Sequence, residues 1–267
     1  MSSESITNEL SILTRDAREH LTYLHELGVD GINKEAGLSA AVVATEPPPV
    51  RPAAFVPPVP GPSSTLFGEI KPAPARLVRS SETFEEIHAD IGNCVRCPLY
   101  ERRTHIVHTE GNRSARLMFI GEAPGADEDA QARPFVGRAG QLLTKIIESI
   151  GFKREDVLIG NVNRCRPPGN RPPTPDEAAT CKPFLLREIA AVGPEVIVVL
   201  GNTATQNLLG VKQGISRLRG QFQDYQGVKV MPSFHPAYLL RDPSKKKETW
   251  EDLKKVRDYL ESTAGRD

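Results

Sequence analysis

Four short runs of apolar residues stand out in the second half of the chain. They occupy residues 117–120, 157–159, 196–200 and 228–231, and a glycine or a proline follows each one. Near-continuous apolar runs of this length are typical of strands whose two faces are both covered, as in a parallel sheet. We therefore predict that the four runs form one buried sheet.

Helical patterns occupy the stretches around these strands. The segments predicted as helices are 139–150, 176–191, 203–209 and 248–260. The second has a clear start, because Thr174 can cap its first turn and Pro175 fits the first helical position. Alternating strands and helices predict right-handed crossovers and a doubly wound α/β fold.

The start of the chain follows a different pattern. Leucine and alanine recur at three- and four-residue steps over residues 5–32, which predicts an amphipathic helix in an N-terminal segment of residues 1–34. A tethered helix cannot bury its apolar stripe alone. We expect the stripe either to bind a partner protein or to pack back on the rest of the chain, and the sequence leaves both open.

A proline-rich stretch follows this helix. Ten prolines lie between positions 47 and 74, a density that excludes regular helix and central strand. Residues 35–80 are therefore predicted to be a disordered linker. The remainder, residues 81–267, is predicted to be the α/β domain.

Distinctive residues end each predicted strand. They are Gly121-Glu122, Asn161, Gly201-Asn202 and the segment from Ser233 to His235. Ligands of open α/β sheets bind at the carboxyl ends of the strands. The convergence of these residues at one edge predicts an active site there.

Charge and hydropathy limit the possible partners. The chain has 34 basic and 34 acidic residues, so its net charge is zero and a nucleic acid would have to be held by locally placed Arg and Lys. The N-terminus lacks the features of a signal peptide, and no apolar run approaches the ~18 residues of a membrane span. We predict a cytoplasmic protein without membrane contact, whose thiols stay reduced.

The chain has four cysteines, arranged as C-x2-C and C-x15-C at Cys94, Cys97, Cys165 and Cys181. Such a set predicts one metal or cluster that ties two distant segments together. Disulfides are not expected in a reducing compartment, whereas buried free thiols remain possible. The spacing favours an iron–sulfur cluster over zinc, because zinc ribbons usually close with a second tight pair; zinc stays open as the alternative.

Four motifs in this order carry a family resemblance. They are Gly121–Gly125 (GEAPG), Arg133–Gly140 (RPFVGRAG), Asn161–Pro168 (NVNRCRPP) and His235–Leu240 (HPAYLL). Together they resemble family 4 uracil-DNA glycosylases, the iron–sulfur type of bacteria and archaea, over roughly residues 82–260. The resemblance implies a three-layer α/β/α domain with a central, mostly parallel four-stranded sheet. It also implies one four-iron four-sulfur cluster on the four cysteines.

The resemblance also implies catalytic roles. Asn161 would read the base, since one amide can both donate to O4 and accept from N3–H of uracil. Phe135 would stack on the flipped base. His235 would donate to uracil O2, and Glu122 would stabilise the cationic sugar or position water.

The loop after the first strand has further implied roles. Backbone N–H groups from Gly121 to Ala123 would help stabilise the departing base, as in an oxyanion hole. Glu128 matches a position that crowds C5 of the base and so excludes thymine. The motifs contain no lysine that could form a Schiff base with the sugar, which predicts simple hydrolysis to an abasic site.

DNA contacts are expected at the same edge of the sheet. Leu239 matches the apolar wedge that fills the gap left by a flipped base. The amides at Gly201 and Asn202 open a helix and could hold a phosphate. Arg166 and Arg241 would add contacts to the DNA backbone.

The sequence thus predicts a monofunctional uracil-DNA glycosylase that starts base-excision repair. Its partner would be single- or double-stranded DNA that contains uracil, and the protein would be monomeric and nucleoid-associated in a bacterial or archaeal cell. One alternative is a non-catalytic DNA-binding or polymerase-associated iron–sulfur module, which would need neither Asn161 nor His235. Another is an electron-transfer protein whose function is the cluster.

Overall fold

The computed structural model describes residues 77–264, so the predicted N-terminal helix and most of the predicted linker lie outside the described residues. Residues 77–80, at the end of the predicted linker, are hydrogen-bonded to the α/β domain. The Leu77 N–H donates to the Gln226 carbonyl at 2.6 Å, and the Ser80 N–H donates to the Ala190 carbonyl at 3.0 Å. The ordered domain therefore includes these residues.

Within the described range the sheet has six strands in the order β1-β3-β2-β4-β6-β5. The strands are β1 (Glu110–Gly111), β2 (Leu117–Gly121), β3 (Leu158–Asn161), β4 (Val196–Leu200), β5 (Gln223–Tyr225) and β6 (Val228–Ser233). Strands β3, β2, β4 and β6 are parallel, and β1 and β5 pair antiparallel at the two edges. The mostly parallel sheet is confirmed, and its parallel centre is the four predicted strands. The count of four omitted both edge strands, which are too short and too polar to show a periodic pattern.

The helices include all four that the sequence predicted, which correspond to α4, α5, α6 and α9. The α-helices are α2 (Phe84–Ile91), α3 (Ala126–Gln131), α4 (Arg138–Ser149), α5 (Pro175–Val192), α6 (Asn202–Leu209), α7 (Ile215–Leu218), α8 (Pro236–Arg241) and α9 (Lys246–Thr263). Thr174 caps α5 as predicted, accepting from the Glu177 N–H, and the Glu177 carboxylate accepts in return from the Thr174 N–H. No helix among residues 77–264 is both long enough and apolar enough to cross a membrane.

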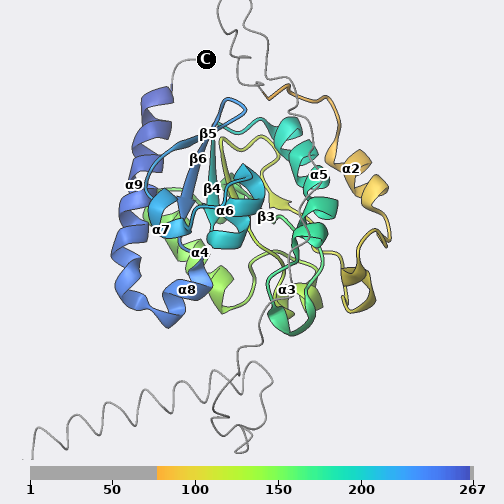
Figure 1. The fold of residues 1–267 in the computed structure, drawn as a ribbon. Helices are drawn as coiled ribbons and strands as arrows, with labels where there is room; N and C mark the ends of the chain where they lie inside the picture. The colour runs from red at the N-terminus through yellow and green to blue at the C-terminus, as the bar shows by residue number, and fades with distance from the viewer. Residues whose placement is uncertain (1–76, 265–267) are drawn as a thin grey trace, which may run out of the picture. The chain divides into compact units, whose positions relative to one another are not determined.

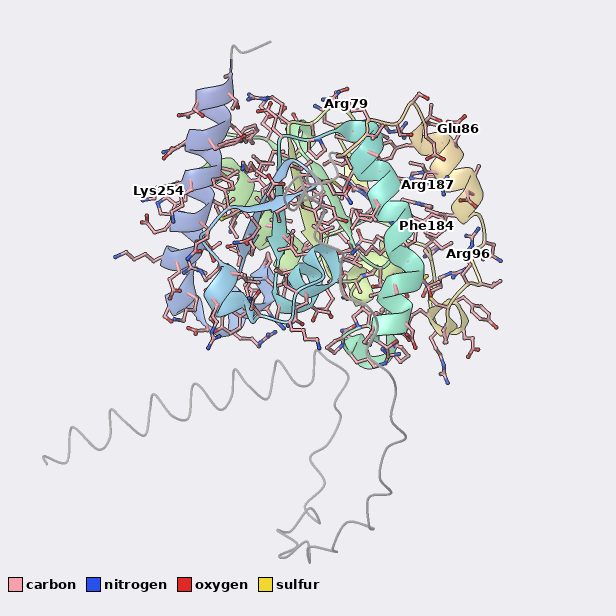
Figure 2. The ribbon with its side chains drawn as sticks, turned by 45° about the horizontal axis from the view of Figure 1, so that its top comes forward. Arg79, Glu86, Arg96, Phe184, Arg187 and Lys254 are labelled. Atoms are coloured by element: carbon pink, nitrogen blue, oxygen red, sulfur yellow. The ribbon has the colours of Figure 1, made fainter. Side chains whose placement is uncertain are left out.

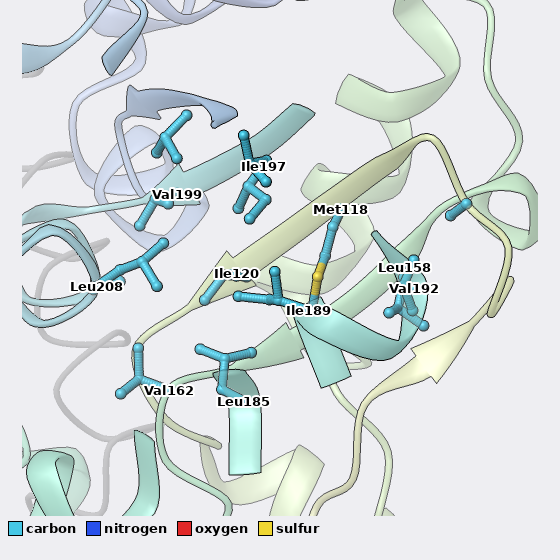
Figure 3. Close-up of a cluster of buried hydrophobic side chains, with 14 of the residues drawn as sticks. Met118, Ile120, Leu158, Val162, Leu185, Ile189, Val192, Ile197, Val199 and Leu208 are labelled. Carbon is cyan, nitrogen blue, oxygen red and sulfur yellow. The ribbon is translucent and has the colours of Figure 1, made fainter. Parts of the chain in front are cut away.

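Two apolar layers enclose the sheet. Alternate residues of a strand point to opposite faces, so Leu117 and Phe119 of β2 pack with α4 and α9, while Met118 and Ile120 pack with α5 and α6. Figure 3 shows the second layer, where the side chains of β2 and β4 meet those of α5 and α6. Both faces of the central strands are therefore buried, which explains their continuous apolar runs, and the three-layer α/β/α arrangement is confirmed (Figure 1).

Helix α2 forms an outer layer on α5. Arg187 of α5, labelled in Figure 2, makes ion pairs with Glu82 and with Asp90, which lie just before and within α2. This contact brings the C-x2-C segment, which follows α2, beside the helix that carries Cys181.

The topology has a switch point at the carboxyl ends of the central strands. From β2 the chain moves outward to β3, then returns past β2 to β4 and continues outward to β6. The order reverses between β2 and β4, and ligands of such sheets bind at this switch point. The carboxyl ends of β2 and β4 carry Gly121 and Gly201, so the predicted site residues meet at the switch point.

Candidate active site

The centre of the site is a contact of Asn161 and Phe135 over Gly121. Gly121 and Asn161 are register partners at the ends of β2 and β3. A Cβ on Gly121 would lie 2.4 Å from Asn161 Oδ1 and 2.5 Å from Phe135 Cζ. Only glycine leaves room here, so the backbone of β2 forms the floor on which an amide and an aromatic ring meet.

Phe135 is held in an unusual backbone conformation. Its φ is +52°, in the left-handed region that bulky residues rarely adopt. Gly140 permits the close approach, because a Cβ there would lie 1.9 Å from the Phe135 carbonyl oxygen. A strained aromatic residue at a strand-end crevice is typical of a functional site.

Glu128 of α3 organises the loop that carries Phe135. Its carboxylate accepts from the N–H groups of Val136 and Gly137, each at 3.0 Å, and from the Gly125 N–H at 3.1 Å. These bonds fix the loop on both sides of α3. The predicted contact of Glu128 with C5 of a base stays a prediction.

His235 is a neutral donor at the opposite wall. It is half-buried at the start of α8, and its Nδ1 accepts from the Ala237 N–H at 3.1 Å. Burial, helped by the positive charge of Arg241, lowers the pKa of His235 to about 4. The ring is therefore neutral at pH 7, and because Nδ1 is an acceptor, the proton lies on Nε2.

His235 lies close to two other predicted site residues. Its ring centroid lies 5.8 Å from that of Phe135, with 31° between the ring planes. Gly201, with φ +89°, lies directly behind it, since a Cβ there would be 3.0 Å from the His235 Cβ. The structure thus brings together five predicted residues: Gly121, Phe135, Asn161, Gly201 and His235.

Glu122 lies at the switch point with a residue that the sequence analysis did not identify. Burial raises the pKa of Glu122, and a hydrogen bond with Thr203 opposes that rise. Thr203 is in the first turn of α6, immediately after Gly201-Asn202, and this proximity in sequence was the available signal. Asn202 itself is engaged within the protein, because its Oδ1 accepts from the Ile215 N–H at 3.0 Å.

The residues predicted to contact DNA differ in their exposure to solvent. Leu239 is 0% exposed and lies inside the domain, whereas the next residue, Leu240, is 38% exposed. A wedge must reach the duplex, so the predicted role of Leu239 conflicts with its burial. Arg241 is exposed, and Arg166 Nε donates to Asn170 Oδ1 at 2.7 Å within its own loop.

The other candidate residue in the β2 loop is Ala123. It is half-buried, as is its neighbour Glu122. The carbonyl of Glu122 accepts from the Asn163 N–H at 3.0 Å, so this loop is fixed to the segment that follows β3.

The four cysteines surround one cavity. Cys165 and Cys181 are buried, Cys94 and Cys97 are half-buried, and all four are free thiols. The other lining residues are Ile91, Arg103, Ile106, Arg164, Thr180 and Phe184. Burial raises the pKa of Cys181 to about 11, so a cation is needed to keep that sulfur ionised at neutral pH.

Hydrogen-bond donors surround the cysteine cavity. N–H donors already point at its sulfurs: the Arg164 N–H lies 3.3 Å from Cys181 Sγ and Arg103 Nη1 lies 3.4 Å from Cys165 Sγ. Across residues 77–264, no three His, Cys, Asp or Glu side chains converge as they would around a single ion. The four cysteines nevertheless line one shared space.

A buried ion pair lies behind this cavity. Arg164 and Glu188 pair with side chains 2% and 0% exposed, and the Thr109 hydroxyl donates to Glu188 Oε2 at 2.6 Å. The Asn163 Nδ2 donates to the Glu177 carbonyl at 2.9 Å. The segment between Asn161 and Cys165 is thus anchored to α5 by groups out of contact with water.

Comparison with known proteins agrees with this fold and geometry. The sequence model of the Uracil DNA glycosylase superfamily matches residues 108–254. The chain therefore belongs to the uracil DNA glycosylase superfamily.

Within the superfamily the chain belongs to the type-4 family. It is 46% identical over 183 residues to the Type-4 uracil-DNA glycosylase of Thermotoga maritima, which covers 67% of this chain and 95% of that protein. It is 43% identical over 183 residues to the Type-4 uracil-DNA glycosylase of Archaeoglobus fulgidus, with 66% and 92% covered. For the Type-4 uracil-DNA glycosylase of Saccharolobus solfataricus the identity is 41% over 190 residues, with 68% and 88% covered.

The buried ion pair gives a stability prediction. Glu188→Leu leaves the Arg164 guanidinium buried without its partner, so we expect the free energy of unfolding to fall by about 3–5 kcal/mol. The double variant Arg164→Met/Glu188→Leu should recover most of this loss, since an apolar pair replaces both charges. Urea unfolding followed by circular dichroism measures both, and equal stability of the single variant and the wild type would contradict the expectation.

Proposed function

We propose that this chain is a monofunctional uracil-DNA glycosylase, which hydrolyses the N-glycosidic bond of uracil in DNA and leaves an abasic site for base-excision repair. The observation that carries the proposal is the meeting of the Asn161 amide, the Phe135 ring and a neutral His235 at the strand ends. Relatives over the same domain are named for this activity.

Base recognition follows from the first two groups. A uracil turned out of the stack would lie against the Phe135 ring, and base–aromatic stacking contributes about 1–3 kcal/mol. Asn161, 3% exposed at the end of β3, would pair its amide with N3–H and O4 of the base. Cytosine presents the opposite donor and acceptor at these positions, so the same amide would reject it.

Departure of the base places negative charge on uracil O2. The His235 Nε2–H is the donor that meets this charge, and the surrounding protein strengthens the bond by excluding water. Because the ring is neutral, His235 can polarise the base without giving up a proton. Glu122, held by Thr203, supplies the carboxyl group on the sugar side, where it stabilises the cationic sugar or orients the attacking water.

We assign one four-iron four-sulfur cluster to Cys94, Cys97, Cys165 and Cys181. The shared cavity and the N–H donors to the sulfurs support a metal centre at these four residues. The C-x15-C spacing favours a cluster over zinc. When bound, the cluster supplies a cross-link between the segment after α2 and the segment after β3. The reaction itself needs only the chain's own side chains and a water molecule.

Base release from a uracil-containing oligonucleotide in EDTA tests the proposal. Strand scission should appear only after alkali treatment, because hydrolysis leaves an abasic site and an intact backbone. His235→Ala removes the donor to O2 and should lower kcat by about 100- to 1000-fold. Asn161→Ala should lose uracil release through loss of base binding. The visible spectrum of each variant serves as the control for an intact cluster, and no product from a cluster-loaded wild type would reject the proposal.

The pKa of His235 gives a pH prediction. Its folded-state value of about 4 lies below the ordinary 6.5, so the neutral form that donates from Nε2 is fully present above about pH 5.5. As far as His235 is concerned, the single-turnover rate should therefore stay flat between about pH 6 and 8. A rate that falls as pH rises through about 6.5 would indicate a charged histidine donor instead.

The free energy of unfolding should also depend on pH through His235. As pH falls from 6.5 towards 4, the unfolded chain binds a proton at His235 and the folded chain does not. The contribution of this histidine to the free energy of unfolding is therefore lost on acidification, and His235→Ala should reduce that part of the acid sensitivity.

Leu240 is the residue that we propose as the wedge in DNA. It is exposed on α8, the helix whose N-cap is His235. One short helix therefore carries both the proposed hydrogen-bond donor to uracil O2 and the exposed leucine side chain. Leu240→Ala should slow release from duplex U·A DNA by about 10-fold or more, since unstacking a base step costs a few kcal/mol. Release from single-stranded DNA should change little, because no base pair has to be opened.

Leu239→Ala is the matched control for that prediction. Leu239 is a core residue, so its truncation should lower the free energy of unfolding by about 2–5 kcal/mol without a duplex-specific effect. Equal slowing of Leu240→Ala on both substrates would contradict the wedge role.

A further inference from the structure

Arg103 connects the two halves of the cysteine set. Its Nη1 lies 2.6 Å from the Cys94 carbonyl oxygen and 3.4 Å from Cys165 Sγ. Its Nη2 donates to Asn93 Oδ1 at 2.7 Å. One half-buried guanidinium therefore binds both the C-x2-C segment and the segment after β3, which the sequence separates widely.

Arg96 covers the same cavity from outside. Its Nη1 lies 3.6 Å from Cys94 Sγ, and its Nη2 donates to Asp90 Oδ1 at 2.9 Å. The guanidinium carbon lies 5.0 Å from the ring centroid of Phe184, a lining residue, and that of Arg187 lies 5.7 Å from the same ring (Figure 2). Two arginines thus lie within cation–π distance of the ring of Phe184.

These N–H donors stabilise the negative charge of the cysteine sulfurs. Four thiolates in a cavity with apolar walls carry negative charge that water cannot solvate. Three of the sulfurs receive an N–H donor from an arginine, namely Arg96, Arg103 and the backbone of Arg164. The fourth, that of Cys97, receives a backbone hydrogen bond from Leu99. Hydrogen bonds to ligand sulfurs stabilise the bound cluster and raise its reduction potential, and a cation adds to both effects.

We propose that Arg103 is a positioning residue of the cysteine site, which sets Cys94 and Cys165 in place before the cluster is assembled and retains the cluster afterwards. Arg96 assists by closing the solvent side. The inference rests on the cluster assignment made under the proposed function. It gives a role to two basic residues that take no part in binding the base.

The test compares Arg103→Met, Arg103→Lys and Arg102→Met in the full chain, purified without oxygen. Arg102 is the exposed neighbour and serves as the matched control. Loss of visible absorption in excess bathophenanthroline disulfonate, an iron chelator, measures cluster release. Arg103→Met should release its cluster about 10- to 100-fold faster than the wild type, which is the usual effect of removing such a partner of a metal ligand. The release rate of Arg103→Lys should lie between those of the wild type and Arg103→Met, because lysine keeps the positive charge but lacks the planar, two-pronged guanidinium.

The reduction potential gives a second readout that a merely structural residue would not change. Removal of the cation beside Cys165 should make the midpoint potential of Arg103→Met more negative, whereas Arg102→Met should match the wild type. If Arg103→Met fails to fold, the release rates of Arg103→Lys and Arg96→Met decide the question, and both should exceed that of the wild type.

The outcomes separate the two levels of the proposal. Arg103 variants that release the cluster at the wild-type rate and keep its potential would overturn the role of Arg103. A wild-type protein that contains zinc, or neither iron nor sulfide, would instead overturn the cluster assignment while leaving the base-binding residues untouched.

Discussion

The structure depends on one short segment that serves two sites. Asn161 closes β3 beside Gly121, and Cys165 lies only four residues later on the wall of the cysteine cavity. Arg164, between them, is buried and paired with Glu188 of α5. Because an unpaired buried charge is costly, this pair holds the segment in one position. The Asn161 amide, which we propose reads the base, and the cysteine site are therefore held by the same anchored segment.

The active site is assembled by close backbone approach rather than by large side chains. Gly121 leaves room for Asn161 and Phe135, Gly140 for the strained Phe135 backbone, and Gly201 for His235. A side chain at any of these glycines would displace Asn161, Phe135 or His235. The same compactness partly buries His235, and this burial lowers its pKa to about 4 and keeps the imidazole neutral. The close packing of the site therefore also sets the charge state of its histidine.

The charged side chains of this protein act through their individual positions and not through a net charge. The chain has no net charge, yet arginines occupy specific positions around the cysteine cavity, where Arg96 and Arg103 approach the sulfurs. Planar guanidinium groups suit this task because they bridge two acceptors at once and stack on aromatic rings such as Phe184. Gross composition says nothing about such placement, since it counts charges without locating them.

The sequence by itself determined the four central strands, four of the helices and the residues at the strand ends. Burial on both faces demands continuous apolar runs, and helical faces demand a regular period. Only the tertiary structure decided which of Leu239 and Leu240 is exposed, because a helix of six residues with adjacent leucines has no readable period. It likewise decided the neutral state of His235 and the contacts of Arg103. Exposure, pKa and hydrogen bonding depend on neighbours that are distant in sequence, and folding alone brings them together.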